Sequence, residues 1–412
     1  MGEAIITRRG GPGGSGEVIV EFDNFIPLNV SPEFIHLAPT TLSVARDNLE
    51  GASVGDYALF AGGLLSGVYK DTVDAYDASL VRSTPTALSV GRPRLAGASV
   101  GNYALFAGGT GSSPAYRDTV DAYNTSLTRS TPTALSVRRD NLAGASVGNY
   151  ALFAGGQRGS SSYSDTVDAY NTFLTRSTLT ALSARRYWLA GASVGNYALF
   201  AGGSGSPVYQ DTVDAYDTSL TRSTPTALSA ARRGLAGASV GNYALFAGGT
   251  GSSPIHKDTV DAYDASLVRS TPTALSLARN SLAGASVGNY ALFAGGHDGS
   301  YRDTVDAYDA SLVRSTPTAL SVERSILAGA SVGDYALFAG GSGSPVYQDT
   351  VDAYGPPLLV AKLYMPIGTK YKFGESEKTA TTSEIRVPVP LTGYIKYKSG
   401  VVGTEGSALD DS

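Results

Sequence analysis

Residues 97–109 read GASVGNYALFAGG, and near-identical copies of this stretch recur along most of the chain. The copies, in which the sixth residue is Asn or Asp, begin at Gly51, Gly97, Gly144, Gly191, Gly237, Gly284 and Gly329. The motif DTVDAY follows each of the seven copies, and successive copies are spaced 45–47 residues apart. A constant period of this length indicates one supersecondary unit repeated seven times over about residues 35–354.

Each repeat contains the signals of four short β-strands and no helical periodicity. In the second copy these are LAGASV (95–100), YALFA (103–107), DTVDAY (118–123) and STPTALS (130–136). The Gly101-Asn102 pair has the composition of a two-residue hairpin turn, and Gly108-Gly109 can adopt backbone angles that are closed to other residues. Four antiparallel strands at this spacing predict the blade of a β-propeller, so we expect an all-β, seven-bladed fold.

The repeat resembles the kelch repeat, which carries a Gly-Gly pair after the second strand and a tyrosine six residues before a tryptophan. Gly108-Gly109 and Tyr123 fill the first two positions. The tryptophan position holds arginine instead, at Arg82, Arg129, Arg176, Arg222, Arg269 and Arg314. A second arginine, before the first strand, matches the kelch pattern at Arg46, Arg92, Arg139, Arg186, Arg232, Arg279 and Arg324. The resemblance implies a kelch-like propeller over about three quarters of the chain, but kelch propellers serve as enzymes, adaptors and adhesion modules alike.

The seventh repeat stops at Tyr354, before a fourth strand. The missing strand has a counterpart at the other end of the repeat region, because residues 34–43 align with residues 80–89. An N-terminal strand would complete the last blade and remove its open edge. We therefore expect a closed propeller over residues 34–354.

The segments outside the repeats are expected to differ in order. Residues 1–16 are glycine-rich and are expected to form a flexible leader, and residues 404–412 a disordered tail. Residues 355–403 carry several strand-like runs and are expected to form a small β module, with residues 17–33 supplying a β segment that pairs with it. The leader resembles those of short structural proteins of bacterial prophages.

Composition excludes several classes of function. The net charge is −5, from 31 basic and 36 acidic residues, so we expect no nucleic-acid partner. The chain has no cysteine and no run of about 18 apolar residues, which argues against disulfides, thiolate metal sites and membrane insertion. The first ten residues lack the apolar stretch of a secretory signal. The three histidines lie far apart in the sequence and offer little acid–base chemistry.

The carboxylates Asp71 and Asp74 recur in all seven repeats, so they raise the question of catalysis. A single active site seldom needs seven copies of its catalytic pair. Asp74 lies on the strand face that packs on the next blade, where Arg46 and Arg82 can partner it. We therefore expect structural ion pairs, no enzyme activity, no cofactor and no metal. Alternatively, the arginines before the first strands could line the channel mouth and attract an anion.

The copies differ mainly in two places. One is a residue pair before the first strand: Asp47-Asn48, Pro93-Arg94, Asp140-Asn141, Tyr187-Trp188, Arg233-Gly234, Asn280-Ser281 and Ser325-Ile326. The other is the segment of six to eight residues between Gly-Gly and DTVDAY. Antiparallel strands put both places on one face, here called the variable face, whereas the uniform Gly-Asn turns lie on the opposite, hairpin face. Drift of surface loops is the alternative explanation, but only one of the two faces varies.

We expect the variable face to bind a ligand. Aromatic and small polar side chains on it can stack on sugars or anchor a protein, although the tyrosines could equally pack at the strand start. Trp188, the only tryptophan, is the strongest candidate contact, with local packing as its alternative. The candidate ligand-binding residues are Asp47, Asn48, Tyr69, Arg94, Tyr116, Asp140, Asn141, Tyr163, Tyr187, Trp188, Tyr209, Arg233, His256, Asn280, His297, Tyr301, Ile326 and Tyr347.

Both terminal segments are expected to leave the propeller on the hairpin face. A tether opposite a diversified surface is the layout of an adhesin, so we expect a receptor- or glycan-binding module attached to a larger assembly such as a phage particle or cell surface. Its partners would be a cell-surface glycan or protein, and its place a virion or extracellular surface. The alternatives are an intracellular, cytoplasmic kelch-type scaffold, or a hydrolase or oxidase on the same fold. The ligand and the oligomeric state do not follow from the sequence.

Overall fold

The structure is a computed structural model that divides into two compact units. It describes residues 4–9, 17–22, 28–364 except 114, 161, 207 and 345, then 370–373, 376–379, 384–389 and 395–399, with side chains described within 33–357. One unit is the repeat region, His36–Pro356, and the other combines Met1–Ile35 with Pro357–Ser412. Among the residues described, every regular element is a strand, and no helix is long and apolar enough to cross a membrane.

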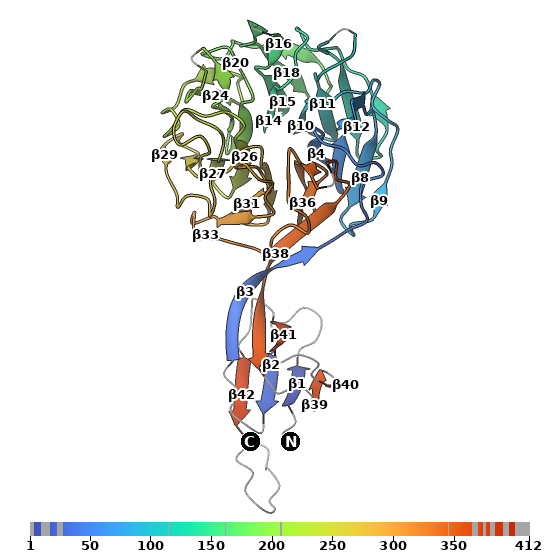
Figure 1. Ribbon diagram of the computed structural model, residues 1–412, viewed down its shortest axis with the longest axis vertical. Helices are drawn as coiled ribbons and strands as arrows, with labels where there is room; N and C mark the ends of the chain where they lie inside the picture. The colour runs from blue at the N-terminus through green and yellow to red at the C-terminus, as the bar shows by residue number, and fades with distance from the viewer. Residues whose placement is uncertain are drawn as a thin grey trace, which may run out of the picture. The chain divides into compact units, whose positions relative to one another are not determined.

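The repeat region is a seven-bladed β-propeller, with seven sheets arranged around a central channel (Figure 1). The inner strands are β4 (Glu50–Val54), β10 (Ala96–Val100), β14 (Ala143–Val147), β21 (Ala190–Val194), β26 (Ala236–Val240), β30 (Ala283–Val287) and β35 (Ala328–Val332). The second strands are β5 (Tyr57–Ala61), β11 (Tyr103–Ala107), β15 (Tyr150–Ala154), β22 (Tyr197–Ala201), β27 (Tyr243–Ala247), β31 (Tyr290–Ala294) and β36 (Tyr335–Ala339). The blades are numbered 1 to 7 in this order.

The outer half of each blade follows the same order. The third strands are β8 (Val73–Asp77), β12 (Val120–Asn124), β18 (Val167–Asn171), β24 (Val213–Asp217), β28 (Val260–Asp264), β32 (Val305–Asp309) and β38 (Val351–Tyr364). The fourth strands are β9 (Arg82–Ser83), β13 (Arg129–Ser130), β19 (Arg176–Thr178), β25 (Arg222–Ser223), β29 (Arg269–Ser270), β33 (Arg314–Ser315) and, in blade 7, β3 (Leu28–Leu37).

The fourth strands of blades 1 to 6 are much shorter than the sequence pattern predicts. The prediction placed them over STPTALS, whereas β9 and its equivalents end after Arg-Ser. Proline explains the early end, because Pro85 and its counterparts have no N–H to continue the ladder. Blade 3 supports this reason: Leu179 replaces the proline, its N–H donates to the Val167 carbonyl at 2.9 Å, and β19 gains one residue.

An N-terminal strand closes the ring, as the sequence predicts. β3 lies beside β38 in the sheet of blade 7, starting six residues before the predicted strand (Figure 1). The register also follows the predicted alignment, in which His36 takes the place of Arg82. His36 Nε2 lies 2.7 Å from Asp352, as Arg82 lies 3.3 Å from Asp74.

The hydrophobic core lies between the blades. The alanines and valine of β10 pack with Leu105 against Phe153 and Tyr170 of the next blade, and five other junctions repeat this pattern. Phe153 and Tyr170 meet edge to face, with ring centroids 6.0 Å apart. Burial of two aromatic rings at each junction stabilises the ring of blades.

The inner strands approach one another closely around the channel. The Ser99 Oγ donates to the Ser53 carbonyl at 2.6 Å, and Ser53 donates in turn to Ser331, so that seven serines form a closed circle of hydrogen bonds: Ser53, Ser99, Ser146, Ser193, Ser239, Ser286 and Ser331. Two residues earlier, a Cβ on Gly97 would overlap the carbonyl oxygen of Gly51. The small residues of GASV are therefore what allows seven strands to meet at one axis.

The second unit contains a five-stranded sheet in the order β40-β39-β1-β2-β42. Its strands are β1 (Ala4–Arg9), β2 (Glu17–Phe22), β39 (Lys370–Phe373), β40 (Ser376–Thr379) and β42 (Ile395–Ser399), and β41 (Glu384–Val389) pairs with β38. β2, from the segment expected to pair with the C-terminal module, runs parallel to β42. Within the segment expected to form the leader, residues 4–9 form β1 from the run AIITRR, which contains three β-branched residues. The expected tail, 404–412, lies outside the described residues.

Candidate functional site

Seven residues form a second closed circle at the mouth of the channel, on the variable face. They are the second members of the variable pairs, here called the mouth ring: Asn48, Arg94, Asn141, Trp188, Gly234, Ser281 and Ile326. The backbone N–H of each donates to the carbonyl of its counterpart in the preceding blade, over 2.9–3.4 Å. All seven have φ between 51° and 62°, a conformation that Asn and Gly tolerate but that strains a β-branched residue such as Ile326.

The first members of the pairs tie the mouth ring to the variable loops. Each pairs with the residue that follows Gly-Gly in its own blade, as Asp47 does with Leu64 and Arg233 with Thr250. In blades 4 and 7 these pairings extend into two-residue strands, β20 (Arg186–Tyr187) with β23 (Ser204–Gly205) and β34 (Arg324–Ser325) with β37 (Ser342–Gly343). The two places that vary in the sequence are therefore neighbours in space.

A cavity of about 520 Å³ opens at this mouth. All seven mouth-ring residues line it, followed by a layer of seven leucines: Leu49, Leu95, Leu142, Leu189, Leu235, Leu282 and Leu327. Glu50 lines it at the deepest level, one residue further along β4. The mouth thus presents different side chains on a backbone that is the same in every blade.

Trp188 is held in position by its neighbours. The Tyr187 ring stacks on Tyr163 with centroids 4.8 Å apart and lies 5.1 Å from the Trp188 ring. The Arg233 guanidinium lies over the indole at 4.7 Å, a cation–π contact, and Trp188 Nε1 donates to Asn141 Oδ1. The side chain nevertheless stays 40% exposed. Local packing and availability to a ligand therefore coexist, because the neighbours fix the ring without covering it.

Two candidate residues are corrected by the structure. Asp47 and Asp140 are only 7% and 3% exposed, so they do not present a carboxylate to a ligand. Asp47 accepts a hydrogen bond from Ser342 Oγ at 2.6 Å, and Asp140 accepts one from Thr110 Oγ1 at 2.7 Å. Burial raises the pKa of Asp140. Their role is to hold the variable loops against the mouth ring.

The tyrosines before the third strand are half-buried, and most of them pair through their backbone with the start of the same variable loop. β6 (Leu64–Leu65) pairs with β7 (Val68–Tyr69), and β16 (Gln157–Gly159) pairs with β17 (Ser162–Tyr163). Tyr116, Tyr301 and Tyr347 form single bridges in the same place. Tyr209 lies 5.7 Å from the Arg233 guanidinium. All six tyrosines therefore remain partly exposed on the variable face.

Two histidines from neighbouring blades meet on the variable face, which their separation in sequence hides. The His256 and His297 rings lie 6.4 Å apart, and His256 Nδ1 is 2.9 Å from the Asn280 amide nitrogen. His297 also contacts the Tyr301 ring at 5.6 Å. Within the described residues, no group of three or more His, Cys, Asp or Glu side chains is placed to hold a metal ion.

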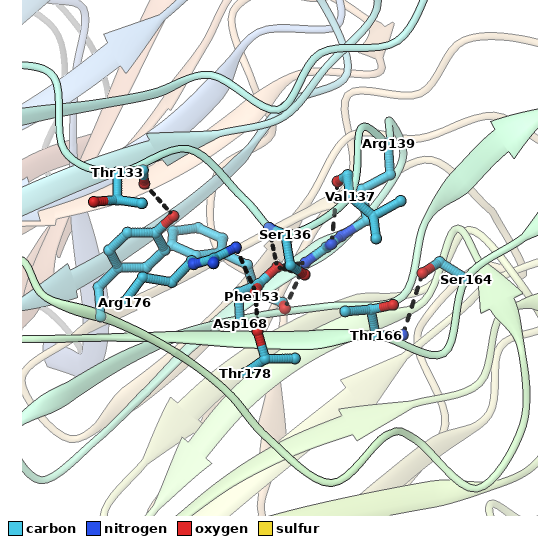
Figure 2. A network of polar contacts seen from close by, with 11 residues as sticks. Thr133, Ser136, Val137, Arg139, Phe153, Ser164, Thr166, Asp168, Arg176 and Thr178 are labelled. Atoms are coloured by element: carbon cyan, nitrogen blue, oxygen red, sulfur yellow. Dashed lines mark hydrogen bonds and ion pairs between the residues drawn. The ribbon is translucent and has the colours of Figure 1, made fainter.

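The repeated arginines before the first strands do not reach the channel mouth, so the alternative of an anion-binding ring is corrected. Arg139 is fully buried, and its Nη2 lies 2.8 Å from Asp168 (Figure 2). Asp168 also accepts hydrogen bonds from Ser136 and Thr178. Burial lowers the pKa of Arg139, and the charge of Asp168 opposes that shift. All seven blades contain this pair, as expected for structural ion pairs.

Glu50 is not among the residues predicted from the sequence, although the repeat departs from its own pattern at this position. The first strand reads LEGASV in blade 1 and LAGASV in the six other blades. This single departure puts a carboxylate at the floor of the mouth cavity.

The comparisons with known proteins show no family for this chain. No protein-family model and no curated protein matches the sequence. Among solved structures, the chain is similar to one titled "Structure of YjhT", with 13% sequence identity and a TM-score of 0.49 over 78% of this chain and 96% of that chain.

Proposed function

We propose that the protein is a non-enzymatic binding module that takes a cell-surface glycan or protein at the mouth of its channel. The observation that carries this proposal is the mouth ring. Its seven backbone positions are equivalent, yet they bear amide, guanidinium, indole, hydroxyl and aliphatic side chains around one cavity of about 520 Å³. A strained, uniform backbone that displays differing side chains is suited to recognition.

The repeated carboxylates favour binding over catalysis. Asp74 and its six counterparts are engaged by buried arginines, so they are not free to transfer protons. Trp188 and Arg233 instead offer a flat, partly exposed surface whose orientation is already fixed. Such a surface can stack on a sugar ring or pack against a protein with little loss of side-chain entropy.

The route of the chain favours a tethered, kelch-like adhesin. Pro356 lies 4.0 Å from the Cβ position of Gly288, a turn glycine of the hairpin face, so the chain leaves the propeller opposite the mouth. We propose that the terminal segments attach the protein to a larger assembly, such as a phage particle or a cell surface. An intracellular, cytoplasmic scaffold is the second candidate, because the same mouth could equally anchor a protein partner.

The test is a double variant, Tyr187→Ser with Trp188→Asn, which borrows residue types from blades 7 and 1. Asparagine suits the positive φ of position 188, so stability should stay within about 1 kcal/mol. Binding of the full chain to a glycan array and to receptor-bearing cells should weaken about thirtyfold.

The matched control is Phe173→Ser, at a turn on the hairpin face. Phe173 is 86% exposed, and serine occupies this position in blades 1, 2, 4, 5 and 6. This variant should bind like the wild type. Equal loss of binding in both variants, or full binding by the mouth variant, would contradict the assignment of the ligand to the mouth.

A further inference from the structure

Glu50 differs from its counterparts in length and charge at a place where the blades leave little room. The equivalent alanines of the six other blades, Ala96, Ala143, Ala190, Ala236, Ala283 and Ala328, are only 2–7% exposed. The Cγ of Glu50 already lies 3.1 Å from the Cβ position of Gly97 in the next blade. Glu50 lines both the mouth cavity and a second cavity of about 200 Å³ below it, and its carboxylate accepts a hydrogen bond from the Gly51 backbone N–H.

The surroundings of Glu50 do not neutralise its charge. The lower cavity is lined by Glu50 together with alanine, glycine and leucine residues of the inner strands. The charged residues of the mouth cavity other than Glu50 are Arg94 and Arg233, which stand in or beside the mouth ring. In the part of the chain that the structure describes, no side chain forms an ion pair with Glu50.

We infer that the channel is a binding site for a primary alkylammonium group, which enters through the mouth ring and pairs with Glu50. One carboxylate matches one positive charge, whereas Ca²⁺ takes six to eight oxygen ligands. The neighbouring backbone does not supply these, because the Gly51 carbonyl is directed at the adjacent strand. Glu50 is the first residue of β4 and follows both the mouth ring and the leucine layer, so the cation must stand at the end of a slender chain.

Lysine side chains and free polyamines have this shape, whereas an amine attached directly to a sugar ring does not reach so deep. The leucine layer above Glu50 is apolar, so it can pack against the methylene groups of such a chain. Burial raises the pKa of Glu50 to about 8, so an ammonium group would favour the ionised carboxylate and release a proton on binding near neutral pH.

This inference deepens the proposed function by naming a chemical group of the ligand, but it is tested with small molecules and does not depend on the macromolecular partner. Calorimetric titration of the full chain with n-butylamine should show binding with proton release, and n-butanol, its uncharged analogue, should show none. Glu50→Ala introduces the residue of the other six blades, so it should fold normally and bind butylamine at least tenfold more weakly.

A rescue variant uses the sevenfold repetition of the channel. In Glu50→Ala with Ala190→Glu, the carboxylate moves to the same level of blade 4, and butylamine binding should return. Competition by a lysine-containing peptide would identify a protein as the source of the amine. Competition by spermidine but not by the peptide would identify a free polyamine. Unchanged binding in Glu50→Ala, equal binding of butanol, equal competition by KCl, or no binding by the wild type would each overturn the inference.

Discussion

Substitution of Asp168 by alanine tests the idea that buried Arg–Asp pairs stabilise the blades rather than act in chemistry. Asp168 and Arg139 are both fully buried, and the carboxylate accepts hydrogen bonds from Arg139, Ser136 and Thr178 (Figure 2). Removing one partner of a buried pair typically costs 3–5 kcal/mol, because the remaining charge is left uncompensated. We therefore expect Asp168→Ala to lose roughly 3–5 kcal/mol of unfolding free energy.

Urea unfolding followed by the fluorescence of Trp188, the only tryptophan, measures this loss in the propeller. Asp165→Ala is the matched control in the same blade, because Asp165 pairs with Arg185 at the surface, where such pairs contribute less than about 1 kcal/mol. Replacing both members of the buried pair, Asp168→Leu with Arg139→Met, should cost less than the sum of the two single changes. A loss below about 1 kcal/mol in Asp168→Ala would refute the reasoning. A stable variant that no longer binds or acts on a ligand would restore a functional role for Asp168.

Three further predictions concern the closure of the propeller, the packing of its inner strands and the charge of Glu50. Deleting residues 1–43 leaves β38 with an open edge, so light scattering should show aggregation; a monomer with unchanged melting would contradict the closure. Gly144→Ala would press a methyl group onto the Gly97 carbonyl and lower the melting temperature sharply, whereas Gly67→Ala meets no atom within 4 Å and should cost only about 1 kcal/mol of backbone strain. The pKa of Glu50 is raised from 4.5 to about 8, so the native state favours its protonated form and stability should fall as pH rises through that window, by at most about 5 kcal/mol. Glu50→Gln should abolish this fall in urea midpoints between about pH 5 and about pH 9; an unchanged pH dependence would contradict it.

The sequence predicts the propeller because the same local signals for turns and strands recur in every blade. The two-residue turn at Gly101-Asn102, the YALFA strand and the Gly-Gly pair recur seven times. The alignment of residues 34–43 with residues 80–89 puts His36 at the position of Arg82, and His36 contacts Asp352 there. The pattern fails where the lack of one backbone N–H ends a strand, as at the proline after the fourth strand of blades 1, 2, 4, 5 and 6.

The candidate site is less predictable, because its geometry arises only when the ring closes. The sequence identifies the variable pairs, but not that their second members, such as Trp188, bond to one another around the channel. Asp47 and Asp140 look like polar surface residues until the loops fold over them. His256 and His297 meet because adjacent blades bring their loops together.

The circle of the mouth ring is closed by main-chain hydrogen bonds, so it can form whichever side chain each position carries. Each blade therefore contributes one residue pair and one loop to the mouth, and any blade could in principle take the place of another. Exchanging two blades would permute the order of chemical groups around the mouth, while the repeated strands kept the same contacts at every junction. Seven such positions on an invariant frame constitute a combinatorial display, in which new arrangements of a binding surface arise by rearranging blades without redesigning the core.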